Sequence, residues 1–453
     1  MTATMNTWWL FIGHEEIKIE LKQLEDEGRD PAPVKAGLER LLKLSGDELR
    51  LPKNQEKAGE LFDRARTLKM RKGYEFDEPS DLKSIRKLRP RGPRKYARRL
   101  PDKVLLDRIT AAWTARCCGC LLGRAPIEGA RSWEMEGFLK MTGQWPLRDY
   151  FRFGVRGKAA REYPKFTAGA HLDTIDHMPV DDDTNYTTTG FLLVKQRGAD
   201  FAPRDAADFW MMNIPLLATC TAERVAYRNF AMNLAPPDSA TFRNPFREWI
   251  GAQIRADAFG YLNAGDPQRA AEFGWRDASI SHVKNGIYGE MWAAAMIAAA
   301  PYCETFEEII RVGLSEIPRT SRLHAAVSEV LDWRKRGLTY EAAVQKIHDR
   351  WDEQFHHDWC HTITNAVIVA VGLLWGEDDF GTSICRAVTP GYDTDCNAAT
   401  IGSVFGMRYG TEALPEKWTR KINNTLKTSL VGYETVRLDQ IARETWELAR
   451  KIR

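Results

Sequence analysis

Apolar residues recur at intervals of three and four along most of the chain beyond residue 101, the spacing that places them on one face of a helix. Strict alternation of apolar and polar residues, which is typical of a half-buried strand, is almost absent. The sequence therefore predicts an all-α fold. The predicted helices cover 104–123, 184–196, 248–262, 286–300, 322–336, 340–351, 361–375, 396–410, 416–429 and 436–452.

The first hundred residues have a different pattern of apolar and polar residues. Residues 1–80 form a pattern of short polar helices with narrow apolar stripes. The segment "KSIRKLRPRGPRKYARR", residues 83–99, then holds nine basic residues, no acidic ones, two prolines and a glycine. We predict an N-terminal helical extension, 1–100, whose basic arm is 83–99, and one large domain at 101–453. The arm is interpreted as wrapping an acidic face of the same protein, with phosphate or nucleic-acid contact as the alternative.

The charge balance argues against nucleic acid as a partner, because 65 basic and 62 acidic residues leave a net charge of only +3. The longest apolar run, 291–303, has the length of a buried helix and falls well short of a membrane span. No targeting segment is recognisable, so we expect a cytoplasmic protein that does not enter membranes. The eight cysteines lie mostly in apolar runs, which is typical of buried free thiols in a reducing compartment.

Two acidic clusters stand at the start of apolar helices. "DDDTNYTTTG" begins with Asp181, Asp182 and Asp183, and "GYDTDCNAATIGSVFGMRYG" contains Asp393 and Asp395. A helix N-terminus favours negative charge, so capping explains one carboxylate in each cluster. Adjacent carboxylates repel one another, and further ones are costly unless a cation compensates them. Since Mg²⁺ and Mn²⁺ prefer carboxylates, hydroxyls and water, the two clusters together predict a divalent-metal site.

Small residues follow the second cluster at a spacing of four. Ala398, Gly402, Gly406 and Gly410 line one helical face, which predicts that another backbone approaches it closely. A calcium-binding EF-hand loop is excluded at both clusters. Each matches positions one, three and five of that loop, but neither has the glycine at position six or the glutamate at position twelve.

Four segments together resemble the motifs of the ADP-ribosylglycohydrolase family, in that family's order. The two acidic clusters look like its two metal motifs. "ARCCGCLLGRAPIEG", 115–129, is similar to its first helix, and "SISHVKNGIYGEMWAAAMIAAA", 279–300, is similar to its central segment. The resemblance covers 101–453. It implies an all-α helical bundle with a dinuclear metal cleft that hydrolyses a glycosidic bond at C1 of a ribose.

The resemblance also implies roles for individual residues. Asp182, Asp183, Asp393 and Asp395 would bind two divalent ions, Mg²⁺ or Mn²⁺, and Glu128 would be a metal ligand or an acid–base group. Two such ions, about 3.5–4 Å apart, can clamp vicinal hydroxyls and orient a water molecule. Glycoside cleavage passes through an oxocarbenium-like state, so Glu128 and Asp183 are predicted to act at the anomeric carbon.

Two of the implied metal ligands depart from the family's pattern. Asp181 and Cys396 stand where the family usually has a serine or threonine ligand. A carboxylate in place of a hydroxyl adds negative charge. A neutral thiol is a poor partner for a hard ion such as Mg²⁺.

Six further residues are predicted to contact the substrate: His282, Asn285, Tyr288, Tyr392, His361 and Asn365. The substrate is expected to be a ribosyl-containing small molecule or an ADP-ribosylated macromolecule, and no oligomeric state is predicted. Two alternatives stay open. One is a metal-dependent glycosidase for a nucleoside or another small glycoside, without recognition of ADP-ribose. The other is a non-enzymatic relative that uses the fold for binding or packing.

Overall fold

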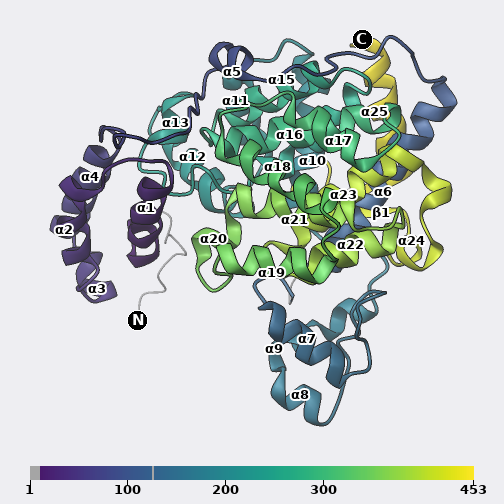
Figure 1. Ribbon diagram of the computed structural model, residues 1–453, viewed down its shortest axis with the longest axis horizontal. Helices are drawn as coiled ribbons and strands as arrows, with labels where there is room; N and C mark the ends of the chain where they lie inside the picture. The colour runs from purple at the N-terminus through teal and green to yellow at the C-terminus, as the bar shows by residue number, and fades with distance from the viewer. Residues whose placement is uncertain (1–10, 125–126, 453) are drawn as a thin grey trace.

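The computed structural model describes residues 11–124 and 127–452. Within these ranges the secondary structure consists of helices and one two-stranded antiparallel sheet (Figure 1). In that sheet β1 (Thr425–Lys427) pairs with β2 (Thr435–Arg437), and Leu426 lies opposite Val436. The prediction of an all-α fold is confirmed.

Two helices within residues 101–452 pack at unusually close range, α6 (Asp102–Gly123) and α23 (Thr394–Tyr409). A Cβ atom at Gly402 or Gly406 of α23 would collide with the backbone of α6, and one at Gly123 would collide with the backbone of α23. The small residues spaced by four therefore serve the predicted purpose. They fix the N-terminal end of α23 against the C-terminal end of α6.

The body, residues 101–452, holds the remaining helices. The first acidic cluster, Asp181 to Asp183, lies at the start of α10 (Asp182–Arg197). Helix α16 (Asn285–Ala299) is buried along its whole length. The other α-helices of the body beyond residue 200 are α11 (Pro203–Asn213), α12 (Thr221–Ala231), α13 (Asp238–Thr241), α14 (Asp257–Leu262), α15 (Pro267–Ala278), α17 (Phe306–Leu314), α18 (Arg322–Lys335), α19 (Tyr340–Arg350), α20 (His356–Cys360), α21 (Thr362–Leu374), α22 (Phe380–Val388), α24 (Glu416–Ile422) and α25 (Leu438–Lys451). Of these helices α22, α24 and α25 pack against α6, as does α10.

A small helical segment protrudes from the body after α6. It appears in blue at the bottom of Figure 1 and leads from α6 towards α10. Stacked rings of Phe138 and Phe166, whose centroids lie 4.6 Å apart, hold its helices together. These helices are α7 (Ser132–Met141), α8 (Lys158–Glu162), α9 (Pro164–Thr167) and the 3₁₀ helix η2 (Ala168–Asp173).

Residues 11–100, called the extension below, form a second helical unit at the side of the body (Figure 1). A small core of its own includes Ile17, Leu24, Leu38 and Phe62. Burying these side chains lets the short helices persist although their sequences are mostly polar. The helices are α1 (His14–Asp26), α2 (Ala32–Leu41), α3 (Gly46–Leu49), α4 (Pro52–Ala65) and α5 (Leu82–Leu88).

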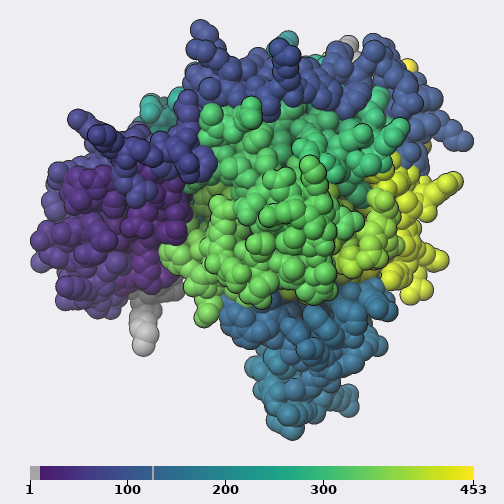
Figure 2. All heavy atoms as spheres, viewed as in Figure 1, coloured from purple at the N-terminus to yellow at the C-terminus, as the bar shows by residue number. Residues whose placement is uncertain are grey.

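The basic arm runs along the surface of the body, as Figure 2 shows in dark blue across the top of the molecule. Arg89 and Arg94 contact Glu316 at 2.5 and 2.8 Å, and Arg86 contacts Glu272 at 2.6 Å. These pairs confirm the interpretation of the arm as a segment that wraps an acidic face of its own protein.

Two of the predicted helices are wrong in extent. Residues 248–262 do not form one helix, because Ile250 N–H donates to Cys360 O at 2.9 Å instead of continuing a helical turn. Only the 3₁₀ helix η4 (Gln253–Arg255) and α14 follow. The helix predicted at 416–429 ends with α24, because Asn423 and Asn424 adopt positive φ angles of 44° and 52° and lead into β1.

No helix among the described residues is both long enough and apolar enough to cross a membrane.

Candidate metal centre

The two acidic clusters meet where the N-terminal ends of α10 and α23 face the C-terminal end of α6. Asp181 is the N-cap of α10, and its side chain accepts a hydrogen bond from Asp183 N at 3.1 Å. Asp393 is the N-cap residue of α23. Thr394 Oγ1 donates to Gly123 O at 2.6 Å, which ties the second cluster to α6. Segments more than two hundred residues apart therefore share one site.

Asp183 lies at the centre of this arrangement. Its ligand atom and those of Asp395 and Cys396 all lie within 4.8 Å of one another, and the same holds for Asp183, Asp181 and Cys120. Asp183 is thus common to two groups that could each hold an ion. Among the described residues, Asp182, Asp393 and Glu128 belong to no group this close, although they border the same site.

The cluster carries more negative charge than its surroundings balance. Arg116 Nη2 lies 3.0 Å from Asp183 Oδ1, but its Nη1 also lies 3.0 Å from Asp257. Arg124 Nε is 3.6 Å from Asp181 Oδ2. Two arginines therefore face a set of buried aspartates, one of them already shared with a carboxylate outside the cluster. A cation would relieve the remaining repulsion.

The ionisation of the aspartates reflects this excess. Burial, followed by repulsion from Asp181 and Asp393, raises the pKa of Asp182 to about 7. Burial also raises the pKa of Asp183 well above its usual value, despite the opposing effect of Arg116. For Asp395, burial and the charges of Glu128 and Asp393 raise the pKa in the same way. A divalent ion would reverse these shifts.

The carboxylate oxygens of this cluster suit Mg²⁺ or Mn²⁺, whereas the thiol of Cys396 does not. The carboxylates supply the hard oxygen ligands that these ions prefer. Cys396 Sγ donates to Asp183 Oδ2 at 3.1 Å. Burial and the charge of Asp183 raise the pKa of its thiol well above the ordinary value, which keeps the thiol protonated. In this state Cys396 orients Asp183, and it can become a ligand only by losing its proton.

An open hollow of about 390 Å³ adjoins the cluster. Glu128 lies exposed at its surface, yet the surrounding atoms and the carboxylates of Asp393 and Asp182 raise its pKa to about 8. A carboxyl group with such a pKa holds its proton at neutral pH and can donate it. Arg124, Glu128, Asp181, Asp182, Asn185, Cys220 and Ser429 are among the residues that line the hollow.

Three of the residues predicted to contact substrate lie in the interior under the extension. Asn285 Nδ2 donates to Glu78 at 2.8 Å and to Glu248 at 2.9 Å. The hydroxyl of Tyr288 donates to the carbonyl of Pro79. His282 is buried, and its Nδ1 lies 2.8 Å from Ser281 Oγ. The polar groups of Asn285 and Tyr288 are therefore engaged by residues 78–79, not directed into the hollow.

The other three lie behind the second acidic cluster. Asn365 Oδ1 accepts from Asp393 N at 3.3 Å and from Asn397 Nδ2 at 2.8 Å. His361 caps α21, since its Nδ1 accepts from Ile363 N at 3.1 Å. Tyr392 is fully buried, and its hydroxyl donates to Trp351 O at 2.8 Å. Asn365 and Tyr392 therefore hold the backbone before α23, and His361 holds the start of α21.

The sequence reasoning missed Arg116, Arg124 and Cys220. Arg116 carried a usable signal, because it is the one charged residue within the small, apolar stretch "ARCCGCLLG". A buried arginine in such a helix needs a carboxylate partner. Arg124 and Cys220 had no comparable signal, since only the fold brings them to the hollow.

Comparisons with known proteins agree with the sequence resemblance. The model of the family described as ADP-ribosylglycohydrolase matches residues 101–452. A solved structure described as an ADP-ribosylglycohydrolase-related protein complex is similar at 18% sequence identity, with a TM-score of 0.44, and the match covers 78% of this chain and 100% of that one. No curated protein matches this chain.

Proposed function

This chain belongs to the ADP-ribosylglycohydrolase family, and we propose that it is a metal-dependent hydrolase of a bond at C1 of a ribosyl group. The substrate is an ADP-ribosylated macromolecule or an ADP-ribose derivative, with Mg²⁺ or Mn²⁺ as the ions. Family membership indicates glycohydrolase activity in general. The observation that carries the finer proposal is the convergence of Asp181, Asp183 and Asp395, with too few arginines to balance them, beside an open hollow.

The buried aspartates would hold the ions, with Asp183 between the two groups. When bound, a pair of divalent ions supplies electrophilic assistance and a place for adjacent hydroxyls. Arg116 and Cys396 fix the orientation of Asp183 from two sides, through Nη2 at 3.0 Å and Sγ at 3.1 Å. Such fixed carboxylates favour positive charge as it develops at the anomeric carbon.

Glu128 is the proposed proton-transfer group. It lies at the surface of the hollow, where a substrate can reach it, and burial with the neighbouring carboxylates raises its pKa to about 8 in the metal-free protein. It can therefore protonate the leaving atom as the bond to C1 breaks, and then accept a proton from the attacking water. Asp182 lines the same hollow and contributes negative charge beside the developing cation.

A comparison of ribosyl and 2-deoxyribosyl substrates tests the proposal. A site that engages two adjacent hydroxyls loses one contact with the 2-deoxy substrate, so hydrolysis should slow by about 10³-fold or more. Removal of divalent ions by a chelator should abolish turnover, and Mg²⁺ or Mn²⁺ should restore it. Equal rates on both substrates, or full activity in chelator, would overturn the mechanism.

A further inference from the structure

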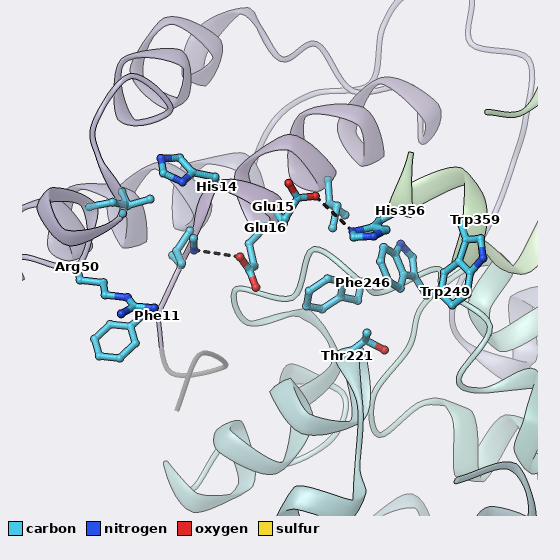
Figure 3. A pocket seen from close by; sticks show the side chains of 15 residues that line it. Phe11, His14, Glu15, Glu16, Arg50, Thr221, Phe246, Trp249, His356 and Trp359 are labelled. Carbon is cyan, nitrogen blue, oxygen red and sulfur yellow. Dashed lines mark hydrogen bonds and ion pairs between the residues drawn. The ribbon is translucent and has the colours of Figure 1, made fainter. Parts of the chain in front are cut away.

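A large cavity between the extension and the body lies apart from the candidate metal centre. Its volume is about 660 Å³, and Figure 3 shows Phe246, Trp249 and Trp359 of the body along it. It shares no lining residue with the acidic hollow. Phe246 and Trp249 are each only 4% exposed, and their rings meet edge to face at 4.8 Å. This aromatic wall therefore packs within the fold and offers little apolar surface to a partner.

The border of the acidic hollow is different, because its apolar side chains are exposed. The three most exposed large apolar side chains among the described residues are Met212 at 74%, Leu217 at 61% and Val431 at 61%. Leu217 lines the hollow itself, together with the exposed Val180. Single exposed apolar residues are normal in proteins, but several along one border indicate a surface that a partner covers.

Backbone contacts join these residues into one surface. Ser429 lines the hollow, and Val431 follows two residues later in the loop between β1 and β2. Val431 N donates to Asn213 O at 3.1 Å, which holds this loop against the end of α11. Met212 precedes Asn213, and the 3₁₀ helix η3 (Leu216–Ala218) then returns the chain to the hollow. We call this surface the apolar rim and define it as Val180, Met211, Met212, Leu217 and Val431.

The chemistry of the rim favours a polypeptide over a nucleic acid as its partner. Apolar side chains are contacts that proteins offer, whereas binding to a phosphate backbone depends on lysine and arginine. The rim residues carry no charge. Among the described residues that line the hollow, Arg124 is the one basic side chain, and it already lies 3.6 Å from Asp181.

The two methionines at the end of α11 suit partners of variable sequence. Met211 and Met212 are both exposed. Methionine side chains are flexible and polarizable, so they adapt to apolar groups of different shapes. Surfaces of this kind accept several partners. The rim therefore suits an apolar stretch in general better than one fixed motif.

We propose that the apolar rim binds the polypeptide that carries the ribosyl group, through an apolar stretch beside the modified residue. The inference rests on the proposed function and narrows its substrates to ADP-ribosylated proteins. The ribosyl group occupies the hollow, and the rim holds the protein part. Because Leu217 borders the hollow and consecutive Cα atoms lie about 3.8 Å apart, residues up to about four positions from the modified one reach the rim.

The first experiment measures release of ADP-ribose from synthetic peptides by the full-length chain with Mg²⁺. Two peptides carry ADP-ribose on the same central residue, and the pair is made with arginine and with serine as that residue. Leucines stand at the second and third positions on both sides in one peptide, and serines stand there in the other. The leucine peptide should have a kcat/KM at least about tenfold higher, mainly through KM, because these contacts form equally in the ground and transition states. Equal kcat/KM values would overturn the inference.

A double variant tests whether the rim causes this preference. Met212→Ser with Val431→Ser removes two exposed side chains that do not line the hollow, so the fold should be retained. It should lower kcat/KM for the leucine peptide at least about fivefold and leave the serine peptide unchanged. Leu51→Ser with Met70→Ser, which removes two exposed apolar side chains of the extension, is the matched control and should change neither. Equal effects of the rim variant on both peptides would contradict the assignment.

Peptide binding in chelator separates this inference from the proposed function. Fluorescence anisotropy of labelled peptides should give a Kd at least about tenfold lower for the leucine peptide, in the wild type and in Asp395→Ala alike, and the rim variant should remove most of this difference. If it does so while no peptide is hydrolysed with Mg²⁺ or Mn²⁺, the proposed function fails and the binding surface stands. If both peptides are hydrolysed at equal rates and bind equally, the inference alone is refuted. Sedimentation that shows wild-type dimers and a monomeric rim variant would assign the rim to a second copy of this chain and overturn the inference.

Discussion

Buried carboxylates occur in two regions of this molecule, and their partners differ. At the junction of extension and body, Arg322 lies 2.8 Å from Glu78 and 2.7 Å from Glu248. Nearby, Glu27 is approached by Arg247 at 2.6 Å and by Lys284 at 2.9 Å. In the candidate metal centre, Asp181, Asp183 and Asp395 face mainly one another and two arginines.

The pKa values of Glu78 and Asp182 differ in the same way, although burial raises the pKa of Glu248 at the junction. Burial alone would raise the pKa of Glu78, but the charge and hydrogen bonds of Arg322 outweigh it and the pKa is lowered. Burial raises the pKa of Asp182 to about 7, and its acidic neighbours add to the effect. The junction is thus a structural network balanced by its own side chains. The centre lacks such internal partners, and a cation from outside would balance it.

The largest effect is expected from Asp395→Ala. Loss of one central carboxylate should lower kcat by about 10³-fold or more, since an electrostatic interaction of several kcal/mol is lost and each 1.4 kcal/mol is tenfold. The increase in melting temperature produced by Mg²⁺ or Mn²⁺ should disappear with it. Asp379→Ala is the control, because that exposed aspartate caps α22 at Thr382 N away from the centre. Normal activity in Asp395→Ala would contradict the view that the carboxylates of the centre, unlike those of the junction, serve catalysis.

Arg322→Met should have the largest effect on stability. It leaves Glu78 and Glu248 buried without their cation, which should lower the free energy of unfolding by about 3–5 kcal/mol. Denaturant titration measures this, with the exposed Arg336→Met as the control. The metal-dependent increase in melting temperature should survive in Arg322→Met, because the junction does not hold the ions. Equal stability of the two variants would show that the network is not structural.

Glu128→Gln should affect turnover more than binding. The amide cannot transfer a proton, so kcat should fall by about 10²–10³-fold while KM changes little. Its fold should be retained, because Glu128 is exposed and makes, among the described residues, no contact that holds the helices together. Glu162→Gln, an exposed substitution in the same protruding segment, is the control for steady-state kinetics. A parallel rise in KM would assign Glu128 to substrate binding instead.

The smallest effect is expected on the stability of the metal-free protein, measured with a chelator present. It tests whether carboxylates of the centre destabilise the fold while those of the junction stabilise it. Folded Asp182, with a pKa of about 7, holds a proton that the unfolded chain releases near its ordinary value of 3.8. Metal-free stability should therefore fall as the pH rises from about 4 to about 7. At pH 7.5, Asp182→Asn should stabilise the metal-free protein by about 1–2 kcal/mol, given about 1.4 kcal/mol for each pKa unit and some solvent screening. Glu78→Gln should do the opposite. If Asp182→Asn and Glu78→Gln both destabilise the metal-free protein, the two regions do not differ in this way.

Several features of the fold and the candidate site could be predicted from local sequence. The helical periodicity gave the correct class and most long helices of the body. The small residues after Asp395 predicted a close backbone approach, because spacing by four determines a face without reference to its partner. The helix predicted at 248–262 is wrong because a distant contact determines the backbone there. Its apolar content suits a helix, but the backbone at Ile250 pairs with Cys360, which no local pattern encodes.

The sequence by itself determined that the chain is helical, that two acidic clusters start two of its helices, and that small residues follow the second. These are properties of neighbouring residues, whose spacing is fixed by helix geometry. Only the tertiary structure decided that Arg116 faces Asp183, that Glu78 engages Asn285, and that the extension closes a cavity against Trp249. Contacts of this kind depend on which surfaces bury each other, and burial couples residues hundreds of positions apart that no periodicity relates.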